Sequence, residues 1–265
     1  MSLVDPDPDQ DLTDEELVRY SRQIVLREVG GAGQLRLRSA RVAVVGAGGL
    51  GSPALLYLAA AGVGHLTVVD GDAVSLDNLH RQILFDTDAI GRPKAAEAAD
   101  RLCLLNPAIT VRPVVARLDE ANAAALLGGH HVVVEASDNL ATKFLVNDVC
   151  VRLGIAAVIG AVLRFEGQVV TVPPGAACYR CFFREEPVGP ARTCRDEGVL
   201  GPAAGIVGSL QAVEALRLLV GLGGGQSGRL IEVDALRPRV REIAFPADPG
   251  CTACAAKPEA VVAPA

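Results

Sequence analysis

The sequence predicts an α/β fold, a Rossmann-like, doubly wound and mostly parallel sheet with a smaller antiparallel portion. Three observations support this prediction. Short β-branched runs alternate with helical patterns from residue 41 to about residue 165. A glycine-rich loop separates the first of these strands from the first of these helices. After Arg164 the alternation stops, and strand-like runs without it follow.

The N-terminal region is expected to be a tail followed by a helix. Residues 1–12 are rich in Asp and Pro, which indicates a flexible acidic tail. Thr13 and Glu16 have the spacing of a capping box, so a helix should begin there. Apolar residues then recur at helical intervals as far as Ile24, and we expect the helix to end near the glycine run 30–33.

The alternating region should form βαβ units, which build parallel sheets. Strands are expected at residues 41–45, 66–70, 108–116, 132–136 and 156–159. Helices are expected at residues 53–61, 93–106, 121–127 and 140–153.

The remaining third of the chain, after about residue 165, lacks the alternation of strands and helices. Strands are expected at residues 167–172, 229–234 and 239–245. Residues 183–202 are rich in Pro, Gly and charge, as functional loops often are. The apolar run 202–222 is interrupted by polar and charged residues, so we interpret it as a buried helix and not a membrane span. We expect one domain over residues 13–255, with a first portion at residues 13–165, a second portion at residues 166–255, and a tail at residues 256–265.

Composition excludes several classes of protein. A formal net charge of −6 argues against a nucleic-acid binder. The N-terminus lacks the apolar stretch of a secretory signal, and seven cysteines is an odd number. We therefore expect a reduced, cytoplasmic protein that uses its thiols for metal binding or chemistry and not for disulfides.

The loop between the first strand and helix predicts nucleotide binding. Gly46, Gly48 and Gly51 form the pattern G-x-G-x-x-G, with Gly49 between them, and glycine lets phosphate approach the backbone there. Asp70 ends the next strand, where a carboxylate can accept hydrogen bonds from ribose hydroxyls. These features alone fit NAD or FAD as well as ATP.

A polar and cationic cluster after that strand favours a triphosphate. It contains Asp72, Asn78, Arg81, Gln82 and Lys94. Lys94 stands in the first turn of a helix, where it opposes the helix dipole at a cost of about 0.3–1 kcal/mol. A strong anion nearby would explain that placement, although each charge alone is more often a solvated surface residue.

Asp138 follows the strand expected at residues 132–136. On position alone, it is equally suited to capping the next helix and to binding Mg²⁺ beside phosphates.

The cysteines divide into two groups. Two C-x-x-C pairs, Cys178 with Cys181 and Cys251 with Cys254, can together form a closed, structural Zn²⁺ site. A redox C-x-x-C would need only one pair. The other cysteines are Cys103 and Cys150, expected in the core, and Cys194, which lies between two arginines that would lower the pKa of its thiol.

The chain resembles the MoeB/ThiF family of ubiquitin-activating-enzyme-like adenylyltransferases. The resemblance rests on the glycine loop, N-L-x-R-Q at residues 78–82, the G-x-P-K step ending at Lys94, Asp138 and the C-x-x-C pairs. The resemblance runs from about Leu12 to Cys254, and it implies that residues 13–165 are the nucleotide-binding portion and residues 166–255 the carrier-binding and zinc portion. It implies that Asp70 holds the ribose, that Asn78, Arg81, Gln82 and Lys94 bind phosphate, and that Asp138 binds Mg²⁺.

The resemblance also implies partners. Arg22, in the segment Tyr20–Gln23, would reach into the ATP site of a second subunit, which implies a homodimer. Cys194 matches a position that carries a thioester or persulfide in some members of the family. The implied substrate is a ubiquitin-like sulfur-carrier protein ending in Gly-Gly that serves molybdopterin, thiamine or thiolated-tRNA synthesis, with sulfur supplied by a sulfurtransferase or cysteine desulfurase.

The leading hypothesis is therefore ATP-dependent adenylation of a carrier's C-terminal glycine. An NAD-dependent oxidoreductase is the main alternative, but it leaves the phosphate-binding cluster unexplained. A non-enzymatic zinc adaptor leaves Arg81 and Lys94 unexplained.

Overall fold

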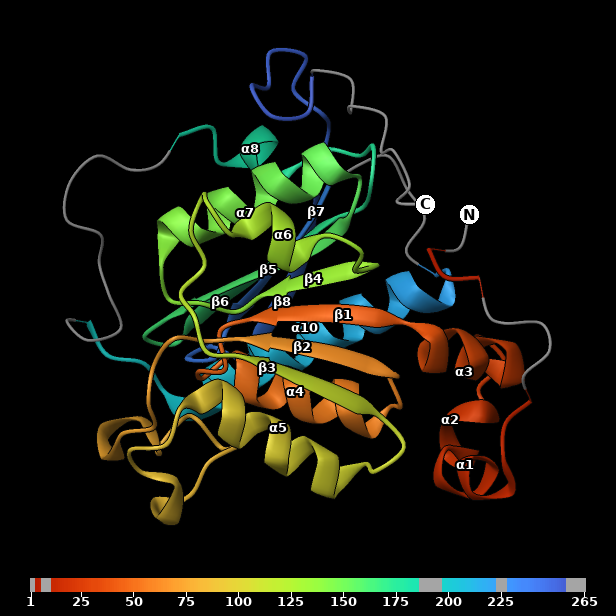
Figure 1. Cartoon of the computed structure of the whole chain (residues 1–265). Coiled ribbons are helices and arrows are strands. Elements are labelled where there is room, and N and C mark those ends of the chain that lie inside the picture. Colours follow the sequence, from red (N-terminus) through yellow and green to blue (C-terminus); the bar gives the residue numbers. More distant parts are fainter. Residues whose placement is uncertain (1–2, 6–10, 186–196, 223–227, 256–265) are drawn as a thin grey trace.

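The computed structural model describes residues 3–5, 11–185, 197–222 and 228–255 of the chain. Within them a single eight-stranded sheet is covered by helices on both faces (Figure 1). The order of its strands is β3-β2-β1-β4-β5-β6-β7-β8. This arrangement confirms the predicted class of fold.

The parallel half of the sheet follows the prediction closely. It contains β1 (Arg41–Val45), β2 (His65–Val69), β3 (Thr110–Val114), β4 (Val132–Glu135) and β5 (Ala156–Leu163). The chain proceeds from β1 outward to β3 and then returns to β4 on the other side of β1. Doubly wound sheets bind ligands at such a switch point, beyond the carboxyl ends of the strands.

The antiparallel strands continue the same sheet and do not pack on it as a separate portion. They are β6 (Glu166–Val172), β7 (Gly228–Asp234) and β8 (Arg239–Phe245). The cause is the length of β5, which extends to Leu163 and not to residue 159 as expected. The extension gives β6 a partner through a tight turn, with Leu163 opposite Glu166.

Alternate residues of each central strand contribute to two cores. Val42 and Val44 of β1 pack in one core, on the face covered by α4 (Gly51–Ala60), α5 (Lys94–Leu105) and α10 (Gly201–Val220). Ala43 and Val45 pack in the other, under α6 (Ala123–Leu127), α7 (Leu140–Leu153) and α8 (Tyr179–Phe182). Two short 3₁₀ turns, η1 (Leu76–Asn78) and η2 (Thr87–Ala89), lie between β2 and α5.

Helix α10 is long and apolar enough to span a membrane by composition alone. Instead it lies across the sheet and against α4, with most of its apolar side chains buried. This confirms the prediction of a buried helix.

The N-terminal region departs from the prediction in two ways. The capping box of Thr13 and Glu16 begins α1 (Asp14–Arg19), which is followed by the short α2 (Ser21–Ile24). However, the glycine run begins α3 (Gly30–Ser39) and does not end a helix. A Cβ at Gly33 would lie 3.1 Å from Val29 Cγ1, tighter than an ordinary contact, and 3.6 Å from Val220 Cγ1 of α10, an ordinary contact. Val4 of the expected tail is buried at 1% exposure in the core.

Candidate functional site

The loop between β1 and α4 requires glycine at both of its ends. Gly46 has φ +92°, and a Cβ there would lie 2.9 Å from the backbone nitrogen of Ser137. A Cβ on Gly51 would lie 1.9 Å from the carbonyl oxygen of Gly46. The loop is therefore folded tightly at the switch point between β1 and β4, with the helix N-terminus of α4 directly behind it, where an anion is favoured.

Asp70, immediately after β2, is tied to this loop. One carboxylate oxygen accepts a hydrogen bond from Ala47 N at 2.8 Å, and the other accepts one from Asp72 N at 2.8 Å. Burial raises the pKa of the Asp70 carboxyl, and the two backbone donors oppose that rise. The side chain thus fixes the glycine loop, and each oxygen keeps a lone pair for another donor.

Arg81 and Gln82 lie over the glycine loop, and Asn78 is hydrogen-bonded to both. The Asn78 side-chain oxygen accepts hydrogen bonds from Gln82 Nε2 at 2.6 Å and from an Arg81 guanidinium nitrogen at 3.2 Å. Ideal Cβ positions on Gly49 and Gly48 lie 3.4 Å from Arg81 Cγ and 3.6 Å from Gln82 Nε2. Gln82 Oε1 is buried and has no hydrogen-bond partner among the described residues, so a polar group is available here to a ligand.

Lys94 begins α5 and is almost buried, at 6% exposure. Its ammonium lies 3.5 Å from Asp72 Oδ2, and its backbone nitrogen donates to the Asp72 carbonyl at 2.8 Å. Asp72 also faces Arg117, a residue that the sequence analysis missed, at 3.3 Å. In the folded chain a Cβ on Gly71 would lie 2.8 Å from Arg117 Cγ, but a glycine in the sequence does not indicate which residue packs on it.

Asp138 is exposed just beyond the carboxyl end of β4. Asp138 does not cap α7. Its neighbour Asn139 does, because Asn139 Oδ1 accepts a hydrogen bond from Thr142 N at 3.3 Å. Among the described residues, the Asp138 carboxylate forms no hydrogen bond or ion pair. It is therefore available to a cation, a carboxylate being the usual ligand of Mg²⁺.

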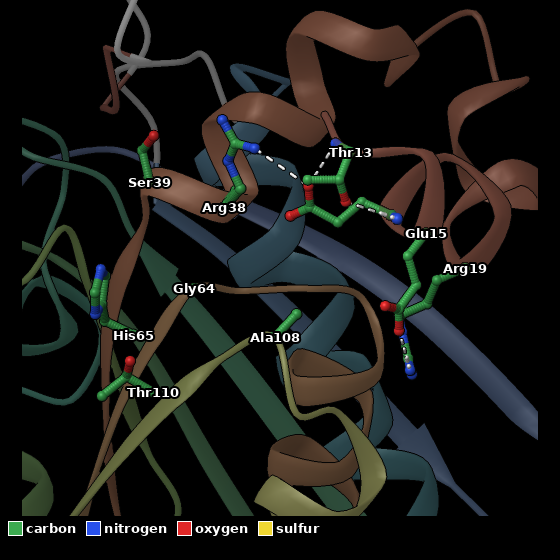
Figure 2. A pocket seen from close by; sticks show the side chains of 10 residues that line it. Thr13, Glu15, Arg19, Arg38, Ser39, Gly64, His65, Ala108 and Thr110 are labelled. Carbon is green, nitrogen blue, oxygen red and sulfur yellow. Dashed lines mark hydrogen bonds and ion pairs between the residues drawn. The ribbon is translucent and has the colours of Figure 1, made fainter. Parts of the chain in front are cut away.

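Arg22 does not join this cluster within its own chain. It is exposed on α2, which with α1 and α3 lies at the end of the sheet where β1 begins, opposite the end that carries the glycine loop (Figure 1). A pocket of about 560 Å³ opens at that same far end, between the N-terminal helices and the starts of β2 and β3 (Figure 2). Its ionic groups are already partnered within the pocket: Arg38 contacts Glu16 at 3.2 Å.

The two C-x-x-C pairs come together as predicted. The four thiol sulfurs of Cys178, Cys181, Cys251 and Cys254 lie within 4.8 Å of one another, with the nearest contacts at 3.3, 3.5 and 3.9 Å. A tetrahedral Zn²⁺ with bonds of about 2.3 Å separates its sulfur ligands by about 3.8 Å. The thiol geometry therefore fits a zinc ion with no open coordination position.

Neighbouring groups support these thiols, and the sequence analysis did not identify them. Asn147 Nδ2 lies 3.8 Å from Cys178 Sγ, and Asp248 N donates to Cys181 Sγ at 3.3 Å. Asn147 also accepts from Tyr179 N at 2.8 Å, so it fixes the start of α8. Hydrogen bonds of this kind orient metal ligands. The available signal was a buried asparagine within the apolar pattern of α7.

The remaining cysteines have different outcomes. Cys150 is buried, as expected, whereas Cys103 is exposed, because it lies on the outer face of α5. Cys194 lies outside the described residues.

The fold and the site define a nucleotide-binding α/β protein with a cluster of four cysteine thiols. The sequence matches the ThiF family over residues 20–253, and the chain belongs to that family. It is 48% identical to a SAMP-activating enzyme E1 of Haloferax volcanii, covering 90% of this chain and 89% of the relative. It is 45% identical to the sulfur carrier protein adenylyltransferase of Thermus thermophilus, covering 93% of each. It is 44% identical to the molybdopterin-synthase adenylyltransferase of Escherichia coli, covering 92% and 98%.

Solved structures confirm the fold. Escherichia coli MccB crystallised with ATP has a TM-score of 0.77 at 21% identity, covering 90% of this chain and 75% of that one. PaaA has a TM-score of 0.72 at 22% identity, covering 90% and 77%.

Proposed function

We propose that this protein uses ATP to adenylate the C-terminal glycine of a ubiquitin-like sulfur-carrier protein ending in Gly-Gly. The observation that carries the proposal is the packing of Arg81 and Gln82 over a glycine loop, with Lys94 buried at the same end of the sheet. Relatives that match this chain over nearly their whole length are named sulfur carrier protein adenylyltransferase and molybdopterin-synthase adenylyltransferase.

The proposed reaction needs no nucleophile from the protein. A carboxylate oxygen of the carrier attacks the α-phosphorus of ATP, the bond to the β-phosphate bridging oxygen breaks, and pyrophosphate leaves with those electrons. The products are an acyl adenylate and pyrophosphate. Arg81 and Lys94 would stabilise the charge that develops on the phosphates, and Asp70 would orient the ribose. Mg²⁺ held by Asp138 would neutralise further phosphate charge.

We further propose a homodimer in which Arg22 completes the ATP site of the partner subunit. Arg22 lies too far from the glycine loop of its own chain to serve it, at the opposite end of the sheet (Figure 1). Apolar side chains around it are exposed, with Val18 and Val25 at 77% and 76%. Such a patch is typical of an interface.

Mixing two inactive variants tests the dimer. Arg22→Ala and Lys94→Ala should each be nearly inactive alone, and mixed subunits should regain up to about a quarter of the wild-type activity, because one site in the mixed dimer is intact. Light scattering supplies the mass. A monomer, or a mixture without recovery, would contradict this proposal.

The adenylate would then be used for sulfur transfer in molybdopterin, thiamine or thiolated-tRNA synthesis, in the reducing cytoplasm. A sulfurtransferase or cysteine desulfurase would supply the sulfur, and Cys194 would carry it or a thioester if this chain takes a covalent part.

Exchange of labelled pyrophosphate into ATP tests the function. We expect exchange only when a carrier ending in Gly-Gly is present, and none when the last glycine is removed. The alternative, an NAD-dependent oxidoreductase, predicts no exchange and tighter binding of NAD than of ATP, and that pair of results would refute the proposal.

A further inference from the structure

A buried ion pair lies directly beneath the phosphate site, and nothing in the reaction above uses it. Glu135 is the last residue of β4 and is fully buried, and Lys143 of α7 is 4% exposed. Lys143 Nζ donates to Glu135 Oε2 at 2.6 Å, to the Ser137 carbonyl at 2.7 Å and to the Gly160 carbonyl at 2.6 Å. All three protons of the ammonium are thus used.

These contacts lie where strands β4 and β5 stop pairing. The ladder between β4 and β5 ends where Glu135 pairs with Ile159, and β5 continues to Leu163 with β6 as its one strand neighbour in the described part of the chain. The Gly160 carbonyl therefore has no strand to pair with on its β4 side. Lys143 satisfies it from one face of the sheet, and from the other face Gln211 donates to the Glu135 carbonyl at 2.7 Å.

The second oxygen of Glu135 holds the segment that leads to Asp138. Glu135 Oε1 accepts from Ser137 N at 2.9 Å and also from the Ser137 hydroxyl. With the Lys143 bond to the Ser137 carbonyl, the donors and acceptor of Ser137 are all fixed by the pair. The backbone of residues 136–137 also contacts Gly46, where a Cβ would lie 2.9 Å from Ser137 N.

Stability alone is a weak reason for this arrangement. Desolvating two charges costs about as much as their attraction returns, and apolar replacements of buried ion pairs are often neutral. Short, fully satisfied bonds to one loop do, however, fix its conformation.

We infer that Glu135 and Lys143 are positioning residues, which hold the Ser137–Asp138 segment so that the Asp138 carboxylate meets the metal-bound phosphates over the glycine loop. This inference rests on the proposed function. The pair touches neither nucleotide nor carrier and acts through Ser137. Removing it should therefore weaken the magnesium-dependent part of ATP binding.

Calorimetric titration with a methylene-bridged ATP analogue, with and without Mg²⁺, tests the inference without any carrier. The double variant Glu135→Gln/Lys143→Met removes both charges, and Ser137→Ala removes the hydroxyl that bonds to Glu135 and also contacts the backbone of Asn139 at 3.4 Å. We expect the first to bind the analogue at least about tenfold more weakly in Mg²⁺ and the second to lose less, while both bind normally without the metal. Thermal unfolding checks that each variant is folded.

Two controls separate positioning from general destabilisation. Glu214→Gln disturbs another buried carboxylate, paired with Arg217 at 2.7 Å on α10, and should leave the magnesium effect unchanged. In an Asp138→Asn background, the double substitution should add no further loss, because the effect passes through Asp138.

The outcomes distinguish this inference from the proposed function. Wild-type protein that binds no analogue would overturn both. Wild-type binding together with an unchanged magnesium effect in folded variants, or with an equal further loss in the Asp138→Asn background, would overturn the positioning role alone.

Discussion

Replacement of Asp138 by alanine should abolish adenylation and leave the fold intact. The carboxylate is exposed and has no hydrogen bond or ion pair among the described residues, so its removal leaves no group unsatisfied. Loss of a group that helps to stabilise charge in a transition state costs about 10²–10³-fold in rate. We expect pyrophosphate exchange to fall by at least that factor, with a change of the melting temperature near zero.

Asn139→Ala is the matched control for this experiment. Asn139 provides the cap of α7, and loss of such a cap costs about 1 kcal/mol of stability. This variant should therefore melt earlier but retain its exchange activity. Wild-type activity in Asp138→Ala would remove Asp138 from the metal site, whatever Asn139→Ala does.

The contrast between these neighbours illustrates what sequence patterns can resolve. Its position after β4 suits Asp138 equally to capping α7 and to binding a metal, because the two roles need the same residue types. Only the coordinates show that Asn139 accepts the bond from Thr142. The capping box at Thr13 was easier, because its two residues satisfy each other within one turn.

Local patterns also located the glycine loop, Asp70 and Lys94, because each is fixed by a strand end or a helix start. They did not reveal Arg117, Asn147 or the role of Lys143, whose partners lie on other elements. The glycine run at residues 30–33 was misinterpreted for a related reason. The run stands at the start of α3, and Gly33 packs against Val29 and against Val220 of α10, so the local rule that glycine ends helices did not apply.

Loss of the zinc site should produce the largest change in stability. Cys178 and Cys181 lie at α8, and Cys251 and Cys254 lie after the edge strand β8. A metal held by all four would therefore join the segment after β8 to the core under α6, α7 and α8. Burial raises the pKa of the Cys178 thiol, and without a metal its protonated form is favoured. Binding of zinc releases these protons, and its free energy adds to that of folding.

We therefore expect freshly purified protein to contain about one zinc per chain, and Cys251→Ser to lose it. The melting temperature should fall by at least about 10 °C, since each kcal/mol shifts the transition of a domain of this size by about 2–4 °C. Cys103→Ser is the matched control, because that thiol is exposed and outside the cluster, and it should change neither quantity. Less than about half an equivalent of metal in fresh wild-type protein, or an unshifted transition in Cys251→Ser, would mean that the four thiols hold no structural ion.

Nucleotide binding by the zinc-free protein, measured below its melting temperature, should persist. The reason is that the glycine loop and Lys94 belong to the parallel half of the sheet and pack around the core covered by α4, α5 and α10.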